Sequence, residues 1–96
     1  MKIKKTVAAN ADLRRIYLYY AKQNPYAAER IIVGVDEKFR LLSRHPLLGR
    51  ERLELGSDVR GILSGSHVIL YSVKADTLTI LRVIDGRMDI ETEFNG

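Results

Sequence analysis

The stretch VRGILSGSHVILYSVKADTLTILRVI, residues 59–84, decides the fold class. It contains three runs rich in β-branched and other apolar side chains, separated by the short polar segments Ser64-Gly65-Ser66 and Lys74-Ala75-Asp76. Runs of this length with turn residues between them are typical of antiparallel strands joined by hairpins. The pattern therefore predicts a three-stranded meander over residues 59–63, 67–73 and 77–84.

The sequence before this meander follows a helical period. Apolar residues recur at the spacing of one helical face, first up to about Gln23 and then over residues 25–45. Asn10 can cap the first helix, and Asn24-Pro25 supplies a cap and a first-turn proline for the second. Because the link between them is so short, we expect the two helices to form an antiparallel hairpin. Around Ile3 the chain predicts one short strand.

These elements give the order β-α-α-β-β-β. The expected fold is therefore α+β, with the helical hairpin packed on one face of a small, mainly antiparallel sheet. A length of 96 residues suits one domain, which we expect to span residues 1–96. Residues 46–58, which contain one proline and two glycines, are expected to form an irregular connector.

Apolar side chains occur on both faces of the predicted strands. In HVILYSV, residues 67–73, Val68 and Leu70 point to one face, whereas Ile69 and Tyr71 point to the other. The two helices shield one face, so the other is covered either by residues 46–58 and 86–96 or by a second polypeptide. We expect a second polypeptide, in contact with four apolar residues: Ile69, Tyr71, Ile80 and Ile84.

Arg82 interrupts an apolar face. Strict alternation places it between Ile80 and Ile84. A buried arginine needs an anion, since breaking a buried ion pair costs about 3–5 kcal/mol. Its partner is either a group of a bound protein or an acid of the same chain, with Glu37, Asp85 and Asp89 as the candidates.

Composition and charge narrow the possible functions. The chain has no cysteine, which excludes disulfides, thiolate metal sites and thiol nucleophiles and makes a cytoplasmic location the simplest expectation. No run of apolar residues is long enough to cross a membrane. Residues 1–50 carry eleven Lys or Arg against four Asp or Glu, a net charge of +7, and residues 51–96 have a net charge of −3. The basic half either faces nucleic acid or an acidic protein, or is the solvated side of the two helices.

No motif indicates a metal, cofactor or catalytic site. His45 and His67 are far apart in the sequence, and the acids after residue 84 are more typical of a solvated tail than of a cation site. Gly61 and Gly65 lack the spacing of a phosphate-binding loop. Ser66 and His67 are adjacent at the start of a predicted strand, so their side chains point to opposite faces and do not predict a nucleophile and base. We expect no catalytic residue, no metal and no cofactor.

Five segments, in this order and spacing, carry a resemblance to a known family: ADLRRIY (residues 11–17), PLLGR (46–50), VR (59–60), VILY (68–71) and ILRVIDGRMD (80–89). The chain resembles the ParE branch of the RelE/ParE superfamily over nearly its whole length. The resemblance implies the β-α-α-β-β-β fold, the toxin role in a type II toxin-antitoxin system, and a ParD-like antitoxin as partner in a hetero-oligomer.

The resemblance also implies a target. ParE-like toxins inhibit DNA gyrase by stoichiometric binding, which requires a binding surface and no active site of their own. We place that surface on the segment after Gly86 together with two strand arginines, and the expected target-binding residues are Arg60, Arg82, Arg87 and Asp89. The antitoxin is expected to contact Ile69, Tyr71, Ile80 and Ile84.

Two alternatives stay open at this point. RelE-like relatives are ribosome-dependent mRNA endoribonucleases that need clustered cations, whereas Ile62 and Val68 stand here where such cations are expected and no tyrosine follows Tyr71. In that reading Arg60, Arg82 and Arg87 would supply the charge. The other alternative is a non-toxic module that only binds an antitoxin.

Overall fold

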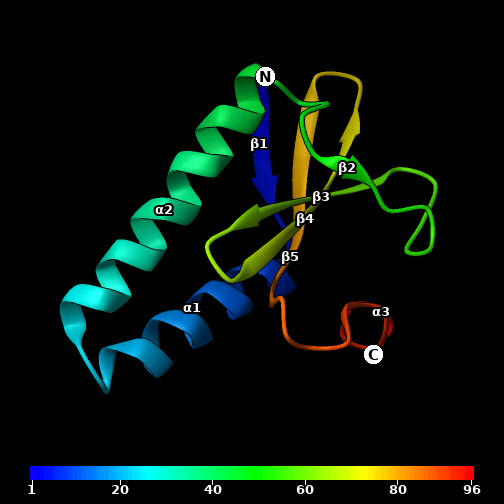
Figure 1. Cartoon of the computed structure of the whole chain (residues 1–96). Coiled ribbons are helices and arrows are strands. Elements are labelled where there is room, and N and C mark those ends of the chain that lie inside the picture. Colours follow the sequence, from blue (N-terminus) through cyan, green and yellow to red (C-terminus); the bar gives the residue numbers. More distant parts are fainter.

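The structure, a computed structural model, describes all residues, 1–96. One five-stranded sheet has the strand order β1-β5-β4-β3-β2. Helices α1 and α2 lie on one side of it, and the connector and the C-terminal helix α3 lie on the other (Figure 1). The elements are β1 (Lys2–Lys5), α1 (Val7–Ala21), α2 (Pro25–Arg44), β2 (Arg50–Glu51), β3 (Val59–Ser64), β4 (His67–Lys74), β5 (Thr77–Asp85) and α3 (Ile90–Asn95). The predicted α+β fold is confirmed, with β2 and α3 as additions.

Helix α1 begins earlier than the sequence predicts. Thr6, and not Asn10, is its N-cap, and the Thr6 side chain accepts a hydrogen bond from the backbone N–H of Ala9 at 3.0 Å. The same hydroxyl donates to the carbonyl oxygen of Leu81 at 2.8 Å. Thr6 is the better cap because one side chain satisfies both the helix end and the neighbouring strand.

Helix α2 begins and ends as predicted. The Asn24 side chain accepts from the backbone N–H of Tyr26 at 2.9 Å, and Pro25 occupies the first turn. The helix ends at Arg44, before Pro46, which cannot continue it. The short turn between α1 and α2 gives the expected antiparallel hairpin.

The sheet is mixed. β1 pairs with β5 in parallel, whereas β2, β3, β4 and β5 pair with their neighbours in antiparallel fashion. A bulge interrupts β5, because Tyr71 pairs with Ile80 while Leu70 pairs with Arg82, which leaves Leu81 as the extra residue. The bulge breaks strict alternation, so the expectation that Arg82 shares a face with Ile80 is wrong.

The helix-side face of the sheet is closed by α1 and α2. Buried residues of α1, α2, β4 and β5 pack together there: Ala9, Ile16, Val35, Phe39, Leu42, Ile69, Tyr71, Leu78, Ile80 and Val83. Amphipathic helices with one apolar stripe account for this layer.

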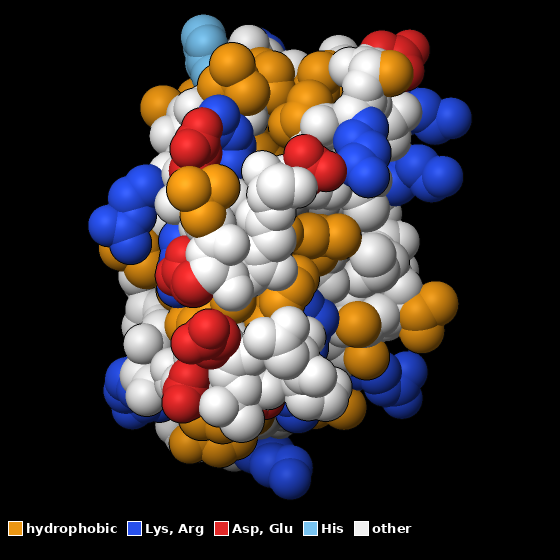
Figure 2. Space-filling view, turned by 90° about the vertical axis from the view of Figure 1, so that its right-hand side faces the viewer, with side chains coloured by type: hydrophobic (Ala, Val, Ile, Leu, Met, Phe, Trp, Pro, Cys, Tyr) orange, Lys and Arg blue, Asp and Glu red, His pale blue; other side chains and the backbone are white.

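The second face is closed by the chain's own connector and C-terminal helix. Leu55 of the connector is buried with Val59, Val68, Leu70 and Ile84, and the partly buried Ile90 and Phe94 of α3 pack on them together with Leu81. Figure 2, which views this side of the molecule, shows apolar side chains interrupted by polar and charged ones.

The expectation that Ile69, Tyr71, Ile80 and Ile84 form an open surface for an antitoxin is therefore wrong. The first three have no exposed area, and Ile84 is 5% exposed. Ile69, Tyr71 and Ile80 lie under the two helices, and Ile84 lies in the cluster that α3 covers. Short segments without a periodic pattern cover the second face, which explains why the sequence pattern favoured a second polypeptide there.

Tyr71 fastens the start of the connector. Its hydroxyl donates to the carbonyl oxygen of Pro46 at 2.8 Å and accepts from the backbone N–H of Gly49 at 2.8 Å. A Cβ atom at residue 49 would lie 2.5 Å from this hydroxyl, so the close approach requires glycine. Burial raises the pKa of Tyr71 above its usual 10.0, although its hydrogen bond with Gly49 acts in the opposite direction. The hydroxyl therefore acts as a neutral tether.

None of the helices is both long and apolar enough to cross a lipid bilayer.

Candidate functional site

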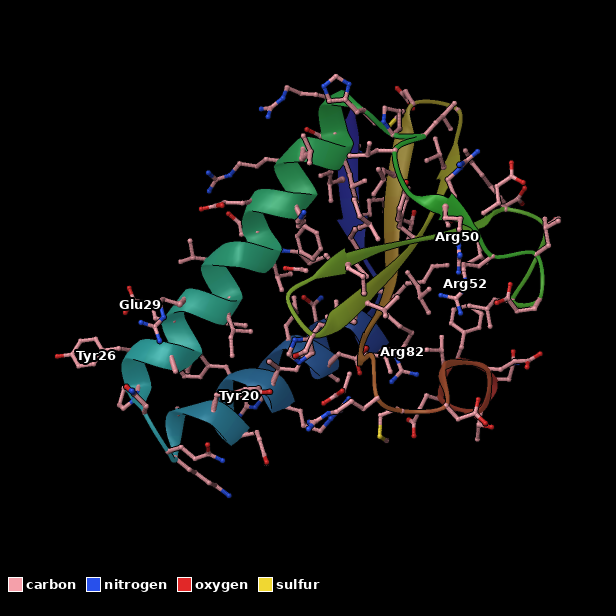
Figure 3. All side chains as sticks on the ribbon, viewed as in Figure 1. Tyr20, Tyr26, Glu29, Arg50, Arg52 and Arg82 are labelled. Atoms are coloured by element: carbon pink, nitrogen blue, oxygen red, sulfur yellow. The ribbon has the colours of Figure 1, made fainter.

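Two of the four expected target-binding residues line one pocket. Arg82 and Arg87 are among the residues around a pocket of about 490 Å³ that lies between α1, the end of β5 and the segment leading into α3. Figure 3 shows Arg82 beside the end of β5, next to α3. Arg60 lies apart from this pocket, in a separate depression with Leu47 and Glu51. The structure therefore does not bring Arg60 to the other arginines.

A buried carboxylate organises this region. Asp12, on α1, is 1% exposed and accepts hydrogen bonds from Arg82 Nε at 2.7 Å and Arg82 Nη2 at 2.9 Å. It also accepts from Arg15 Nη2 at 2.6 Å and from the backbone N–H of Val83 at 2.9 Å. The expected anion for Arg82 is thus within the chain, but it is Asp12 and not Glu37, Asp85 or Asp89.

Asp12 also completes the edge of the sheet. β1 pairs with β5 only as far as Ile80, so the edge of β5 beyond that residue has no strand partner. There the Thr6 hydroxyl donates a hydrogen bond to the carbonyl oxygen of Leu81, and the Asp12 carboxylate accepts one from the backbone N–H of Val83. Side chains of α1 therefore replace the missing strand, which satisfies backbone groups that would otherwise be costly to bury.

The ion pair shifts the titration of both partners. Burial alone would raise the pKa of the Asp12 carboxyl, but hydrogen bonds from Arg82, Val83 and Arg15 together lower this pKa below its usual 3.8. The hydrogen bonds to Asp12 raise the pKa of Arg82 above its usual value. The pair is therefore ionised at neutral pH.

Arg82 also reaches the C-terminal helix. Its Nη1 donates to the backbone carbonyl of Glu93 at 2.9 Å. The guanidinium thus links α1, β5 and α3, and its side chain is 19% exposed. Because each of its three side-chain nitrogen atoms donates a hydrogen bond within the chain, Arg82 positions the C-terminal segment beside the pocket.

The residues after β5 form a short, ordered turn. Arg87 Nη2 pairs with Asp85 Oδ2 at 2.7 Å, and this hydrogen bonding holds the pKa of Asp85 well below its usual range. Asp89 caps α3 by accepting from the backbone N–H of Thr92 at 3.3 Å. Arg87 points to solvent as the expected target contact requires, whereas the carboxylate of Asp89 serves the helix end.

Arg60 is held by the connector. Its Nη1 donates to the carbonyl oxygen of Gly49 at 2.8 Å, and its Nη2 lies 3.3 Å from Glu51 Oε1. These contacts hold β2 and the start of the connector against β3. Arg60 therefore holds the connector in place, in a different depression from the pocket that Arg87 lines.

The pocket also contains residues that sequence reasoning did not single out. Tyr19 and Tyr20 of α1 lie edge to face, with ring centroids 5.0 Å apart, and Tyr20 meets the ring of His67 in the same way at 6.1 Å. Burial lowers the pKa of His67 below its usual 6.5, although the nearby Asp85 acts in the opposite direction. The signal for this wall was the run Tyr17-Leu18-Tyr19-Tyr20, which is too apolar for one helical face.

No three His, Asp or Glu side chains come together as a potential metal site. The functional potential of the region lies in its pocket, its aromatic wall and its paired arginines, an arrangement suited to contact with another macromolecule.

Comparison with known proteins gives concordant results. A sequence model of the family described as the ParE toxin of the type II toxin-antitoxin system parDE matches residues 3–90. Toxin ParE3 of Caulobacter vibrioides is 28% identical over 91 residues, which cover 94% of this chain and 91% of that protein. A solved chain of the chromosomal ParDE TA system from P. aeruginosa superposes with a TM-score of 0.76 at 26% identity, covering 88% of this chain and 95% of that one.

Proposed function

This chain belongs to the ParE toxins of type II parDE toxin-antitoxin systems, and we propose that it acts by stoichiometric binding to DNA gyrase and is neutralised by a ParD-type antitoxin. In this proposal residues 1–96 act as a single domain in the cytoplasm, where gyrase works. The match of the family over residues 3–90 is the observation that carries the proposal.

The ion pairs and positions of Arg60, Arg82 and Arg87 support a role in protein binding and not in RNA cleavage. A nuclease that stabilises a developing phosphorane charge needs preorganised cations that converge on one phosphate. Here Arg60 engages Glu51 and a backbone carbonyl, Arg82 engages Asp12, and Arg87 engages Asp85. Arg60 also lies in a different depression from the other two. This arrangement favours a protein-binding surface.

The surface that we propose for gyrase is the C-terminal turn. Arg87 and Met88 are exposed there, and the Asp12–Arg82 pair and the Asp89 cap hold the backbone in place. A fixed turn with an exposed cation is suited to recognition because it loses little conformational entropy on binding. Asp89 supports this surface by capping α3, whereas Arg60 holds the connector at a separate place.

A ParD-type antitoxin is the proposed partner. The solved chain with which this one superposes comes from a ParDE TA system, and the basic N-terminal half of this chain complements an acidic protein. A permanent complex of this kind buries about 2,000 Å² or more. The complex is therefore expected to be more stable to heat than the toxin alone.

The test is a gyrase assay with purified toxin. We expect the toxin to inhibit supercoiling and to accumulate cleaved DNA, and we expect the antitoxin encoded by the adjacent reading frame to reverse both effects. Arg87→Glu should weaken inhibition, while Arg30→Glu, an equal charge change on the exposed face of α2, should not. Unimpaired gyrase, or cuts in translated mRNA at the ribosomal A site, would overturn the proposed target.

A further inference from the structure

The pocket beside Arg82 has an apolar floor and an aromatic wall. Ile16, Val83 and Ile84 lie among its lining residues, and the ladder of Tyr19, Tyr20 and His67 forms one side. Arg15 and Arg87 also line it, as does the half-exposed Met88. Tyrosine, arginine and methionine are the residue types enriched in protein interfaces, and tyrosine and arginine dominate binding hot spots.

The charges of this pocket are already balanced. Arg15 and Arg82 both pair with Asp12, and Arg87 pairs with Asp85. Glu93 is a further acid in the lining. A phosphate would have to compete with these carboxylates and would meet repulsion from them, so a nucleic-acid strand is a poor occupant. An apolar side chain, which needs no counter-charge, fits the floor better.

The outer surface of α1 indicates which protein supplies that side chain. Asp12 is the one acid in α1 and it is buried, whereas Arg14 and Arg15 are exposed and Lys22 follows the helix end. Tyr17, Leu18 and Tyr19 are 42–56% exposed on the same helix. A segment that covers α1 therefore meets cations and apolar groups but no exposed acid of that helix. Its complement is an acidic segment with bulky apolar residues.

We infer that this pocket is an anchor site of the antitoxin: a bulky aromatic or aliphatic side chain of an acidic antitoxin segment enters it between Tyr19 and Met88, and neighbouring carboxylates of that segment meet Arg14 and Arg15. The inference rests on the proposed function and names the place where the partner is recognised. Since Arg87 forms part of the same rim, the anchor also covers the turn proposed to contact gyrase. Neutralisation then follows from occlusion of that turn.

The experiment measures the affinity of purified toxin variants for the antitoxin encoded by the adjacent reading frame, by titration calorimetry. Tyr19→Ala removes the exposed part of the wall, and Met88→Trp fills the mouth from an exposed position. Each should weaken binding at least about tenfold, equivalent to about 1.4 kcal/mol. Tyr26→Ala is the matched control, because Tyr26 is 76% exposed and lies at the start of α2, outside the pocket (Figure 3). It should leave the affinity within about twofold.

A charge reversal tests the contact between the antitoxin's carboxylates and α1 separately from the apolar anchor in the pocket. Arg14→Glu, at an exposed position that does not pair with Asp12, should weaken binding and reduce its dependence on salt. Each variant is checked for an unchanged melting temperature, so that a loss of affinity reports the surface and not the fold.

The outcomes distinguish the two proposals. If the wild-type toxin does not bind the antitoxin, the proposed function and this inference both fail. If it binds and the pocket variants bind equally well, the proposed function stands and this inference alone is overturned. Binding of a labelled single-stranded oligonucleotide that Tyr19→Ala and Met88→Trp abolish, with antitoxin binding intact, would also overturn it, because the pocket would then be a nucleic-acid site.

Discussion

The two faces of the sheet are covered by different kinds of structure. Helices α1 and α2, of 15 and 20 residues, close the helix-side face with apolar stripes that repeat along their length. The second face is closed by Leu55 of the irregular connector and by α3, a helix of six residues. A long amphipathic helix is held on the sheet by the many apolar side chains that it buries. A short segment buries few such side chains and depends on individual polar contacts. The comparison teaches that the second cover depends on a few tethers: Tyr71, Arg60 and the Asp12–Arg82 pair.

The largest effect is expected for Asp12→Ala. It leaves Arg82 and the N–H of Val83 without their acceptor and should lower the free energy of unfolding by about 3–5 kcal/mol. Urea denaturation measures the loss. Asp36→Ala is the control, because that carboxylate pairs with Arg40 at the surface and should cost less than about 1 kcal/mol. Equal losses for the two variants would break the claim that one tether joins α1 to the C-terminal segment.

The helix-side core should come next. Leu42→Ala on α2 removes a fully buried side chain and should cost about 3 kcal/mol, through lost burial and the cavity that remains. The same urea experiment applies. A loss below about 1 kcal/mol would show that the helix-side layer tolerates voids and is not the main source of stability.

Tyr71→Phe tests the tether of the connector while keeping the ring. It leaves the buried N–H of Gly49 and the carbonyl of Pro46 without the hydroxyl, and should cost about 1–3 kcal/mol. Hydrogen exchange should show faster opening of residues 46–58 with little change in α2. Uniform loosening of the whole chain would contradict a local role.

A smaller effect is expected for Phe94→Ala. Its side chain is only partly buried on the second face, and α3 lies at the chain end, so the loss should be about 1 kcal/mol. Denaturation of Phe94→Ala beside Leu42→Ala therefore compares the two covers directly. If the two losses were equal, the distinction between the faces would not hold.

The smallest effect concerns pH. Because burial lowers the pKa of His67, the unfolded chain takes up a proton more readily than the folded one. This contribution to stability is complete above the usual pKa of 6.5 and is lost as the pH falls through the lower folded value. From about pH 7.5 to about pH 5.5, the free energy of unfolding should decrease more for the wild type than for His67→Gln. Identical decreases would indicate that His67 titrates alike in both states.

Periodicity explains how much of this fold could be predicted. The meander of residues 59–84 and the helix over residues 25–45 have a clear repeat, so their type and order followed from the sequence. The cover of the second face did not, because Leu55, Ile90 and Phe94 belong to segments too short to show a repeat. The bulge at Leu81 was invisible for a related reason: one extra residue reverses the alternation of a strand without changing its composition.

The candidate site was predictable only in part. Arg82 stood out because a charge interrupts an apolar run, and the need for an anion followed from physical chemistry. The identity of that anion did not follow, since Asp12 lies on a helix 70 residues away in the sequence. Tyr19 and Tyr20 come together with His67 only through the packing of α1 against the sheet.

The Asp12–Arg82 pair has a consequence for how such chains diverge. A carboxylate that closes a strand edge and neutralises a guanidinium cannot be exchanged alone, because either single replacement strands the other charge in the interior. Viable descendants should change positions 12 and 82 in concert. An alignment of relatives should then show covariation between these two positions, although they are far apart in the sequence.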